Sequence, residues 1–293
     1  MSLPVPFGQT DLGKFAKPVD TFIKVVAAFI GVRYEPKRII KDAEAKAIAR
    51  RIEATTDVEV ELIYRSLERR IRDDIRSQEN VEAVVRKAIP LVSEEAKPRD
   101  MNTDWMAHFF ENARMYSDEE MQILWAKVLA GEVNAPGKFS RGTVALLSTI
   151  DKRDAELFAT VRRFCINLEG VFIPLIYKLN DKIYQTNGIN SQVLIRLEET
   201  GLVRFAPMYS AEYETRTIDR LKKRRFIEYF GERIWFKQGD QGGDAVATGA
   251  VTLTQAGREL APICDAKPIA GFVDYLKVLW KSFGMEIEDA VAP

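Results

Sequence analysis

A few side chains in this 293-residue chain could carry out acid–base chemistry or bind a metal ion. His108 is the one histidine, which excludes sites with several histidine ligands and leaves one position for a histidine-based triad. It lies beside the apolar Phe109 and Phe110, and no serine or cysteine motif accompanies it. We therefore interpret His108 as an ordinary helix residue rather than a catalytic base.

Acidic residues in the last third of the chain are weaker candidates. Asp240 and Asp244 lie in a glycine-rich run that lacks the ligand order and final glutamate of an EF-hand loop. Glu232 and Lys237 loosely resemble the acid and lysine of metal-dependent nucleases, yet five positions apart on a strand they point to opposite faces. Neither common phosphate-binding glycine loop is present. The sequence therefore predicts no catalytic residue, no metal, no cofactor, no small-molecule substrate and no enzymatic activity.

Composition limits the classes of partner and the location. The 43 basic and 43 acidic residues balance, so no global charge attracts nucleic acid, although local patches remain open. The two cysteines, Cys165 and Cys264, exclude a disulfide framework and favour a reducing cytoplasm. No signal peptide is visible at the start. The longest early apolar run, residues 25–32, is far shorter than the roughly 20 residues that a spanning helix needs.

One dense basic run is the candidate for a nucleic-acid or partner contact. Lysine and arginine side chains that neutralise phosphates add affinity that depends on salt. A solvated helix face explains the same run. The run consists of Arg220, Lys222, Lys223, Arg224 and Arg225.

The first element that must position such contacts is an amphipathic helix beginning near Pro18. Its wide apolar face needs a cover, which is either the rest of the protein, a second subunit or a membrane surface. Few cations flank the face closely, which weakens the membrane alternative; that alternative would place the protein peripherally at the inner membrane. The candidate membrane or oligomer contacts are Phe22, Val26, Phe29 and Ile30.

Residues 37–90 are rich in helix-forming residues and predict two long helices, the second opened by a capping box that starts at Thr56. This second helix carries a narrow apolar stripe among charges of both signs. Such a stripe favours helix pairing, within one chain or between two copies. We predict self-association through these N-terminal helices. The stripe consists of Val60, Ile63, Leu67, Ile71 and Ile75.

Residues 117–141 combine a helix start, a helix stop and a turn around a tryptophan. Ser117 and Glu120 predict a capping box, and Gly131 predicts a left-handed helix end. A proline-glycine turn then leads to a second helix near Ser140. A third helix follows a cap at Asp151, so the region predicts packed helices with Trp125 in the core.

This region resembles a bacterial domain family of unknown function, DUF2806. The resemblance is carried by the Trp125 helix, its Leu129-Ala-Gly-Glu132 end, the Pro136-Gly-Lys-Phe-Ser140 loop and Asp154-Ala-Glu-Leu-Phe158. The helix also looks distantly like the Leu-Trp-Ala-x-Leu-Leu segment of the abortive-infection alpha family. The resemblance implies a bacterial or prophage-encoded setting and, through the distant relative, a role in phage defence. It implies no catalytic residues.

The C-terminal pattern changes to mixed helix and strand. A helix over 190–200, stopped by Gly201 and followed by an extended apolar run, is typical of a winged-helix domain. Strands are predicted at 226–230, 232–237 and 246–253. The segment Thr254–Leu260 then resembles the Leu-Thr-x-x-Gly-x-x-Leu segment that follows the wing in many bacterial winged-helix proteins.

A DNA-binding role for this region has an electrostatic difficulty. The supposed recognition helix carries Arg196 as its one cation, while Glu198 and Glu199 would face the phosphates. Many winged-helix folds instead bind proteins, and a fold does not decide a function.

The sequence predicts a mainly α protein with a C-terminal winged-helix-like α+β domain. The predicted regions are 1–98, with the amphipathic and charged helices; 99–180, the helical signature domain; and 181–293, the winged-helix-like domain with a C-terminal helix. We expect a non-enzymatic interaction protein in phage defence, acting through self-association or a protein partner. The alternatives are a DNA-binding regulator and a peripheral membrane effector.

Overall fold

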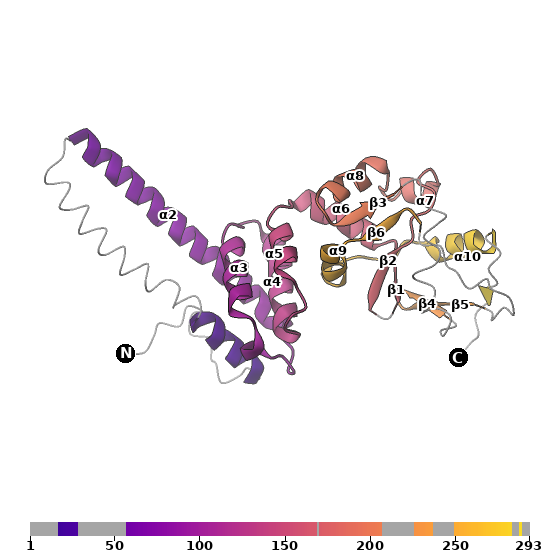
Figure 1. Cartoon of the computed structure of the whole chain (residues 1–293), viewed down its shortest axis with the longest axis horizontal. Coiled ribbons are helices and arrows are strands. Elements are labelled where there is room, and N and C mark those ends of the chain that lie inside the picture. Colours follow the sequence, from indigo (N-terminus) through magenta and orange to yellow (C-terminus); the bar gives the residue numbers. More distant parts are fainter. Residues whose placement is uncertain are drawn as a thin grey trace. The chain divides into compact units, whose positions relative to one another are not determined.

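The computed structural model describes residues 17–28, 57–168, 170–206, 226–236, 249–282 and 287–288 (Figure 1). The chain forms two compact units, residues 1–144 and 145–293, so the predicted region 99–180 contributes to both. The described residues are mainly helical and include two small antiparallel sheets. Among them, no helix has the length and apolar character that crossing a membrane requires.

Unit 1 is built around a long helix and the helices that pack on its C-terminal half. Gln122 Nε2, near the start of α4, donates to Asn80 Oδ1 on α2 at 3.3 Å. Asn134, at the end of α4, donates through Nδ2 to the carbonyl of Leu91, just past the end of α2. The two helices therefore run parallel. The elements are a helix over 17–28, α2 (Asp57–Ala88), η2 (Ile89–Leu91), η3 (Pro98–Asp100), α3 (Thr103–Ala113), α4 (Glu119–Asn134) and α5 (Arg141–Leu147), which extends into unit 2.

The core of unit 1 is aromatic. Trp125 is fully buried, as predicted, and its ring lies 5.2 Å from that of Phe109 and 5.3 Å from that of Tyr116. Phe109 also stacks on Trp105. The spacing of Trp105, Phe109 and Ala113 predicts a helix starting near Asn102. This start is confirmed, because Asn102 accepts a hydrogen bond from the backbone N–H of Trp105.

The predicted capping box of Ser117 and Glu120 is wrong by one residue. Asp118 is the N-cap of α4, and its side chain accepts from the backbone N–H of Met121. Ser117 instead accepts a hydrogen bond from Asn80 Nδ2, which also donates to the carbonyl of Arg114. A contact with α2 therefore takes the hydroxyl that the sequence pattern assigned to the cap.

The prediction that Gly131 ends its helix is also wrong. Gly131 lies inside α4, which continues to Asn134. A Cβ at Gly131 would lie 2.6 Å from the ring of Phe139, so glycine is needed for close packing. The left-handed residue is Gly137 (φ 87°), in the turn that leads to α5.

Unit 2 contains both sheets. One sheet has the strand order β2-β1-β4-β5-β7 and the other pairs β3 with β6; every paired neighbour is antiparallel. The elements are α6 (Lys152–Arg162), β1 (Cys165–Leu168), β2 (Val171–Pro174), α7 (Lys182–Gln185), α8 (Ser191–Glu199), β3 (Val203–Phe205), β4 (Phe226–Tyr229), β5 (Glu232–Phe236), β6 (Val251–Leu253), α9 (Gln255–Leu260), η5 (Ala261–Ile263), α10 (Phe272–Ser282) and β7 (Ile287–Glu288).

The hairpin of β1 and β2 was not predicted, because residues 99–180 were expected to form a helical domain. Helix α6 ends at Arg162, and a hairpin follows with Gly170 (φ 85°) in its turn. Two short apolar runs separated by a Glu-Gly pair are a recognisable hairpin signal. Leu157, Phe158, Val161 and Phe164 have the spacing of a third helix, and this hid the hairpin signal, since a short apolar run fits a helix and a strand equally.

The core of unit 2 forms around Phe272 of α10. Its ring contacts those of Phe164 at 5.1 Å and Tyr229 at 5.2 Å, and all three side chains are buried. Tyr229 Oη also donates to the carbonyl of Arg163 and accepts from the backbone of Ile269. The sheet that contains β4 is therefore fixed to α10 and to the end of α6.

The spacing within the segment Thr254–Leu260 has a structural explanation. Thr254 caps α9 by accepting from the backbone of Gly257, while its hydroxyl donates to the carbonyl of Gly201 at 2.6 Å. A Cβ at Gly257 would lie 2.1 Å from the carbonyl oxygen of Leu202. The Thr-x-x-Gly spacing therefore allows α9 to pack directly against the backbone at the end of α8.

Candidate functional site

The predicted N-terminal contact residues are divided between the core and the part of the chain that is not described. Phe22 and Val26 are fully buried, and Val19 and Ile23 beside them are nearly so. Phe29 and Ile30 lie outside the described residues. Because one chain already covers Phe22 and Val26, these side chains can meet a membrane or a second subunit only if the helix leaves its place in unit 1.

Several exposed apolar side chains of unit 1 lie on the N-terminal half of α2. From Ser77 onward this helix is buried on one side, with Asn80, Val81 and Val84 in the core. The N-terminal half of α2 extends beyond α3 and α4, as Figure 1 shows. The transition from the exposed to the buried half of α2 occurs next to the α3–α4 loop, which Asn80 contacts.

We call the apolar face of this exposed half the α2 stripe. Tyr64, Ile71 and Ile75 are 55%, 56% and 54% exposed, and Ile63 and Leu67 are partly exposed. Their spacing of three and four residues places them on one side of the helix. Tyr64 was missed in the sequence analysis, although it lies seven residues before Ile71. The side chain of Val60 lies outside the described part of α2. The stripe consists of Ile63, Tyr64, Leu67, Ile71 and Ile75.

The polar sides of this helix carry both signs of charge. Arg65 lies 3.8 Å from Glu61, and Arg76 lies 3.4 Å from Asp73, in pairs that are exposed to water. Exposed ion pairs of this kind contribute at most about 1 kcal/mol each. Because these ion pairs contribute little, the apolar stripe is the feature of this surface that is most relevant to binding.

An exposed helix of this length gains from a partner. Residues 57–76 span roughly 30 Å at about 1.5 Å per residue, and isolated helices of about 15 residues are only marginally stable in water. Complete burial of one large aliphatic side chain contributes about 1.5 to 3 kcal/mol. Covering the α2 stripe would therefore stabilise both the helix and a complex.

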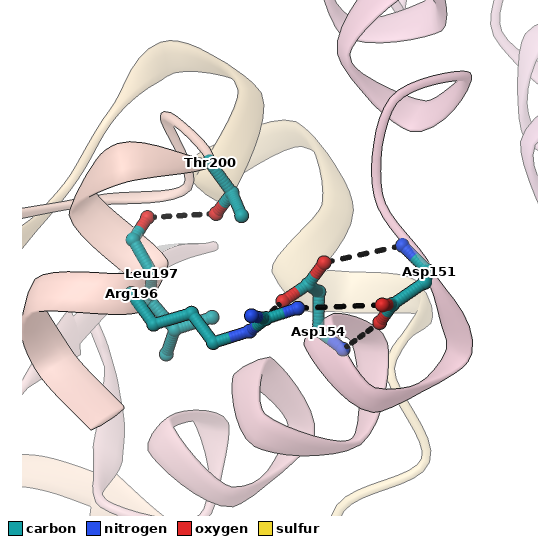
Figure 2. A network of polar contacts seen from close by, with 5 residues as sticks. All are labelled: Asp151, Asp154, Arg196, Leu197 and Thr200. Atoms are coloured by element: carbon teal, nitrogen blue, oxygen red, sulfur yellow. Dashed lines mark hydrogen bonds and ion pairs between the residues drawn. The ribbon is translucent and has the colours of Figure 1, made fainter. Parts of the chain in front are cut away.

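The face of α8 was the other candidate, and its single cation is engaged within unit 2 (Figure 2). Arg196 Nε donates to Asp154 Oδ1 at 2.6 Å, and its Nη2 lies 3.3 Å from Asp151 Oδ2. Asp154 is buried and also accepts from the backbone of Asp151, which completes a capping box at the start of α6. This network confirms the predicted cap at Asp151 and ties α8 to α6.

The same network sets the charge states at the start of α6. A hydrogen bond from the backbone N–H of Asp154, together with the charge of Arg196, holds the pKa of the Asp151 carboxyl below its ordinary value. The hydrogen bond to Asp154 raises the pKa of the Arg196 guanidinium. Both groups are therefore held in their charged forms.

The remaining outward face of α8 is acidic and partly apolar. Ile195 is 46% exposed, and Glu198 and Glu199 are exposed beside it. Glu198 Oε1 also accepts from the backbone N–H of Phe205, which fixes it toward β3. The carboxylates of this face would repel phosphates in the docking geometry that is usual for a recognition helix.

Other residues singled out in the sequence form no reactive cluster in the described part of the chain. The basic run 220–225, Lys237 and the pair Asp240 and Asp244 lie outside it. His108 is partly buried in α3, and its Nε2 has no hydrogen-bond partner. No group of three or more histidine, cysteine, aspartate or glutamate side chains among the described residues could hold a metal ion.

The sequence model of a family described as "Protein of unknown function (DUF2806)" matches residues 64–277, which is most of the chain and includes parts of both units. A search of curated proteins and a search of solved structures each found no match.

Proposed function

The chain belongs to this family of unknown function, and from its geometry we propose that it is a non-enzymatic interaction protein that associates with a second copy of itself. The observation that carries the proposal is the α2 stripe. Its side chains are more than half exposed at Tyr64, Ile71 and Ile75. The C-terminal half of the same helix is buried against α4.

A second α2 is a suitable partner for three reasons. It supplies an apolar stripe of the same length and width, so two helices side by side cover both stripes. The flanking charges nearly balance, so two copies do not repel strongly. A membrane would attract a predominantly basic helix, which this one is not. Its described charges before Ser77 are Glu61, Glu68, Asp73 and Asp74, against Arg65, Arg69, Arg70, Arg72 and Arg76.

Light scattering on the full chain tests this proposal. We expect the wild type to be a dimer or larger, and Ile71→Glu to be a monomer, because a charge on the stripe cannot be desolvated at low cost. Leu62→Glu is the matched control, since Leu62 is 61% exposed on the same helix but lies about 200° around it from Tyr64. A monomeric wild type, or a control that dissociates equally, would contradict self-association through the stripe.

We place this activity in a bacterial cytoplasm and in phage defence. The support is the resemblance of the Trp125 helix to the abortive-infection alpha family. Cells that express the wild type should reduce phage plating, and cells that express Ile71→Glu at the same level should not. Equal protection by both proteins would show that a role in defence does not depend on self-association through the α2 stripe.

A DNA-binding regulator is the second candidate, supported by the order of elements in unit 2. The short helix α7, the helix α8 and the antiparallel pair β3 and β6 follow one another as in a winged-helix-like domain, and Ile176 bridges to Gly249 beside β6. The basic run 220–225 would supply the phosphate contacts.

A gel shift of a duplex at two salt concentrations tests the regulator. If duplex binding is specific to this run, neutralising Arg220, Lys222 and Lys223 together should abolish it and reduce its salt dependence by about one unit of slope per lost contact. Because α8 presents an acidic face, we expect no salt-sensitive binding by the wild type near physiological ionic strength.

A further inference from the structure

The sheet of unit 2 that contains β1, β2, β4 and β5 has two unlike faces. Residues directly opposite each other in antiparallel strands share a face. The register therefore places Ile227 and Ile234 on one face, with Tyr229 two residues along. These side chains are buried, and Tyr229 packs on α10. This is the core face of the sheet.

The opposite face carries partly exposed aromatic and polar side chains. The pairings Phe172 with Asn167, Asn167 with Glu228, and Glu228 with Arg233 make one row across four strands. The next row along β4 and β5 pairs Phe226 with Trp235. The three aromatic side chains are partly exposed, and Arg233 is exposed. We call this set the aromatic face; it consists of Asn167, Phe172, Phe226, Glu228, Arg233 and Trp235.

Arginine side chains stack on the rings of this face. The guanidinium carbon of Arg233 lies 4.7 Å from the centre of the Phe226 ring, which in turn lies 4.8 Å from that of Trp235. At the other end, the guanidinium carbon of Arg162 lies 3.7 Å from the centre of Phe172. Arg162 is fixed there, because its Nε donates to the carbonyl of Ala261. The rings are thus positioned before any ligand arrives.

Phe230 adds a further ring at the Arg162 end of this face. Phe230 has φ 47° in the turn between β4 and β5, a left-handed conformation that is uncommon for an aromatic residue. Its ring is 37% exposed and lies 5.0 Å from the guanidinium carbon of Arg162. Phe230 and Gly231 (φ 88°) form the two-residue turn between Tyr229 and Glu232, and tight hairpin turns commonly need positive φ at both positions.

We propose that the aromatic face binds single-stranded nucleic acid by stacking its bases on Phe172, Phe226 and Trp235. Every base has a π face, so aromatic side chains and arginine planes on an open sheet bind single strands with little sequence preference. A duplex hides those base faces. Self-association through α2 involves unit 1 and a protein partner, whereas the aromatic face lies in unit 2 and binds a nucleic acid.

The distribution of charge fits this ligand and orients it. Arg233 and Arg162 lie on the two sides of the face, and Glu228 lies between them. Phosphates are therefore favoured at the sides, and bases over the middle. In the chain, the basic run 220–225 ends immediately before Phe226, the first residue of β4. Across four strands at about 4.8 Å spacing, the face has room for on the order of two or three bases.

Tryptophan fluorescence provides a direct readout of the contact. The chain has four tryptophans, of which Trp105, Trp125 and Trp280 are buried. Stacking of a base on Trp235 should therefore quench the accessible part of the emission. Trp235→Phe keeps an aromatic ring and should bind with similar affinity, but without that quenching.

The experiment is a titration of the full-length protein with a labelled single-stranded oligonucleotide and with the matching duplex, read by anisotropy and by tryptophan emission. We expect the single strand to bind at least about tenfold tighter than the duplex, and Trp235→Ala to weaken single-strand binding about 5- to 150-fold. Arg233→Gln, at an exposed position that folding tolerates, should weaken it as well. Val278→Ala and Arg153→Gln, both at exposed positions that are not part of the aromatic face, should leave it unchanged.

Three results would overturn the proposal: no binding of the single strand, equal binding of the duplex, or binding that is insensitive to both Trp235→Ala and Arg233→Gln. Ile71→Glu should bind the single strand with quenching of the same size per chain. A failure of self-association would therefore leave this test intact.

Discussion

At the scale of single residues, the carboxylate of Glu132 shows how a sequence signature becomes a structural connection. Glu132 is 2% exposed and accepts hydrogen bonds from the backbone N–H groups of Gly137, at 2.6 Å, and Phe139, at 2.9 Å. Trp105 Nε1 donates to the carbonyl of Phe139 at 2.7 Å. Residues that carry the family resemblance therefore hold the loop after α4 in place.

Glu132→Gln should destabilise unit 1 by roughly 1 to 3 kcal/mol. The NH2 group of glutamine would face one of the two buried backbone N–H groups, which would then lack an acceptor. Urea unfolding of the full chain, followed by tryptophan fluorescence, measures the change. Glu94→Gln, at an exposed position, is the control and should shift the midpoint very little. Equal stability of Glu132→Gln and wild type would show that the two hydrogen bonds contribute nothing net.

Replacing glycine by alanine should have opposite effects on stability at two positions. Gly257→Ala should destabilise unit 2 by about 1 to 3 kcal/mol, since its Cβ would lie 2.1 Å from a backbone oxygen that cannot easily move. Gly142→Ala lies in α5, with its nearest atom 3.7 Å away, and should stabilise by roughly 0.5 to 1 kcal/mol. Thermal unfolding of both variants gives the signs. A stable Gly257→Ala protein would contradict the close packing of α9 against Leu202.

At the scale of elements, helix boundaries with a local cause could be predicted and those with a distant cause could not. Asp151 caps its helix as expected, and the helices that follow Asn102 and Asn190 begin where expected, because capping depends on residues within one turn. The cap of α4 was misplaced because Asn80, far away in the chain, binds Ser117. Gly131 was misinterpreted for the same reason, since the Phe139 ring that leaves no room for a Cβ at this position belongs to a later loop.

Acid should weaken the connection between α6 and α8. The pKa of Asp151 is lowered in the folded chain, so its ionised form stabilises the fold. This contribution is complete above the ordinary carboxyl pKa, about 4, and is lost as the pH falls through the lower folded value. Asp151→Asn keeps a good N-cap but has no charge. The stability difference between wild type and this variant should be present at neutral pH and disappear in acid.

Urea unfolding at neutral pH and below pH 4 measures this difference. Asp274→Asn, at an exposed position on α10, is the control for a change of charge alone. A difference for Asp151→Asn that stays constant with pH would mean that ionisation of Asp151 does not stabilise the fold.

At the scale of the whole molecule, the mainly helical character with strands in the C-terminal region followed from periodicity and glycine placement. The sequence did not predict what covers each apolar face, because an apolar face indicates only that some surface must cover it. The N-terminal helix and the α2 stripe looked alike in this respect, yet Phe22 is fully buried while Ile71 is more than half exposed. The aromatic face was missed because it depends on strand register between β1 and β4, which lie far apart in the chain.

Self-association through the α2 stripe is the central claim, and photocrosslinking tests it most directly. A photoreactive phenylalanine analogue replaces Tyr64, which is 55% exposed and already aromatic, and the variant is mixed with isotopically labelled chains. We predict covalent dimers in which position 64 is joined to residues 57–76 of the differently labelled chain, and far fewer when the analogue replaces Leu62. Crosslinks confined to one chain, or equal yields at both positions, would contradict the claim.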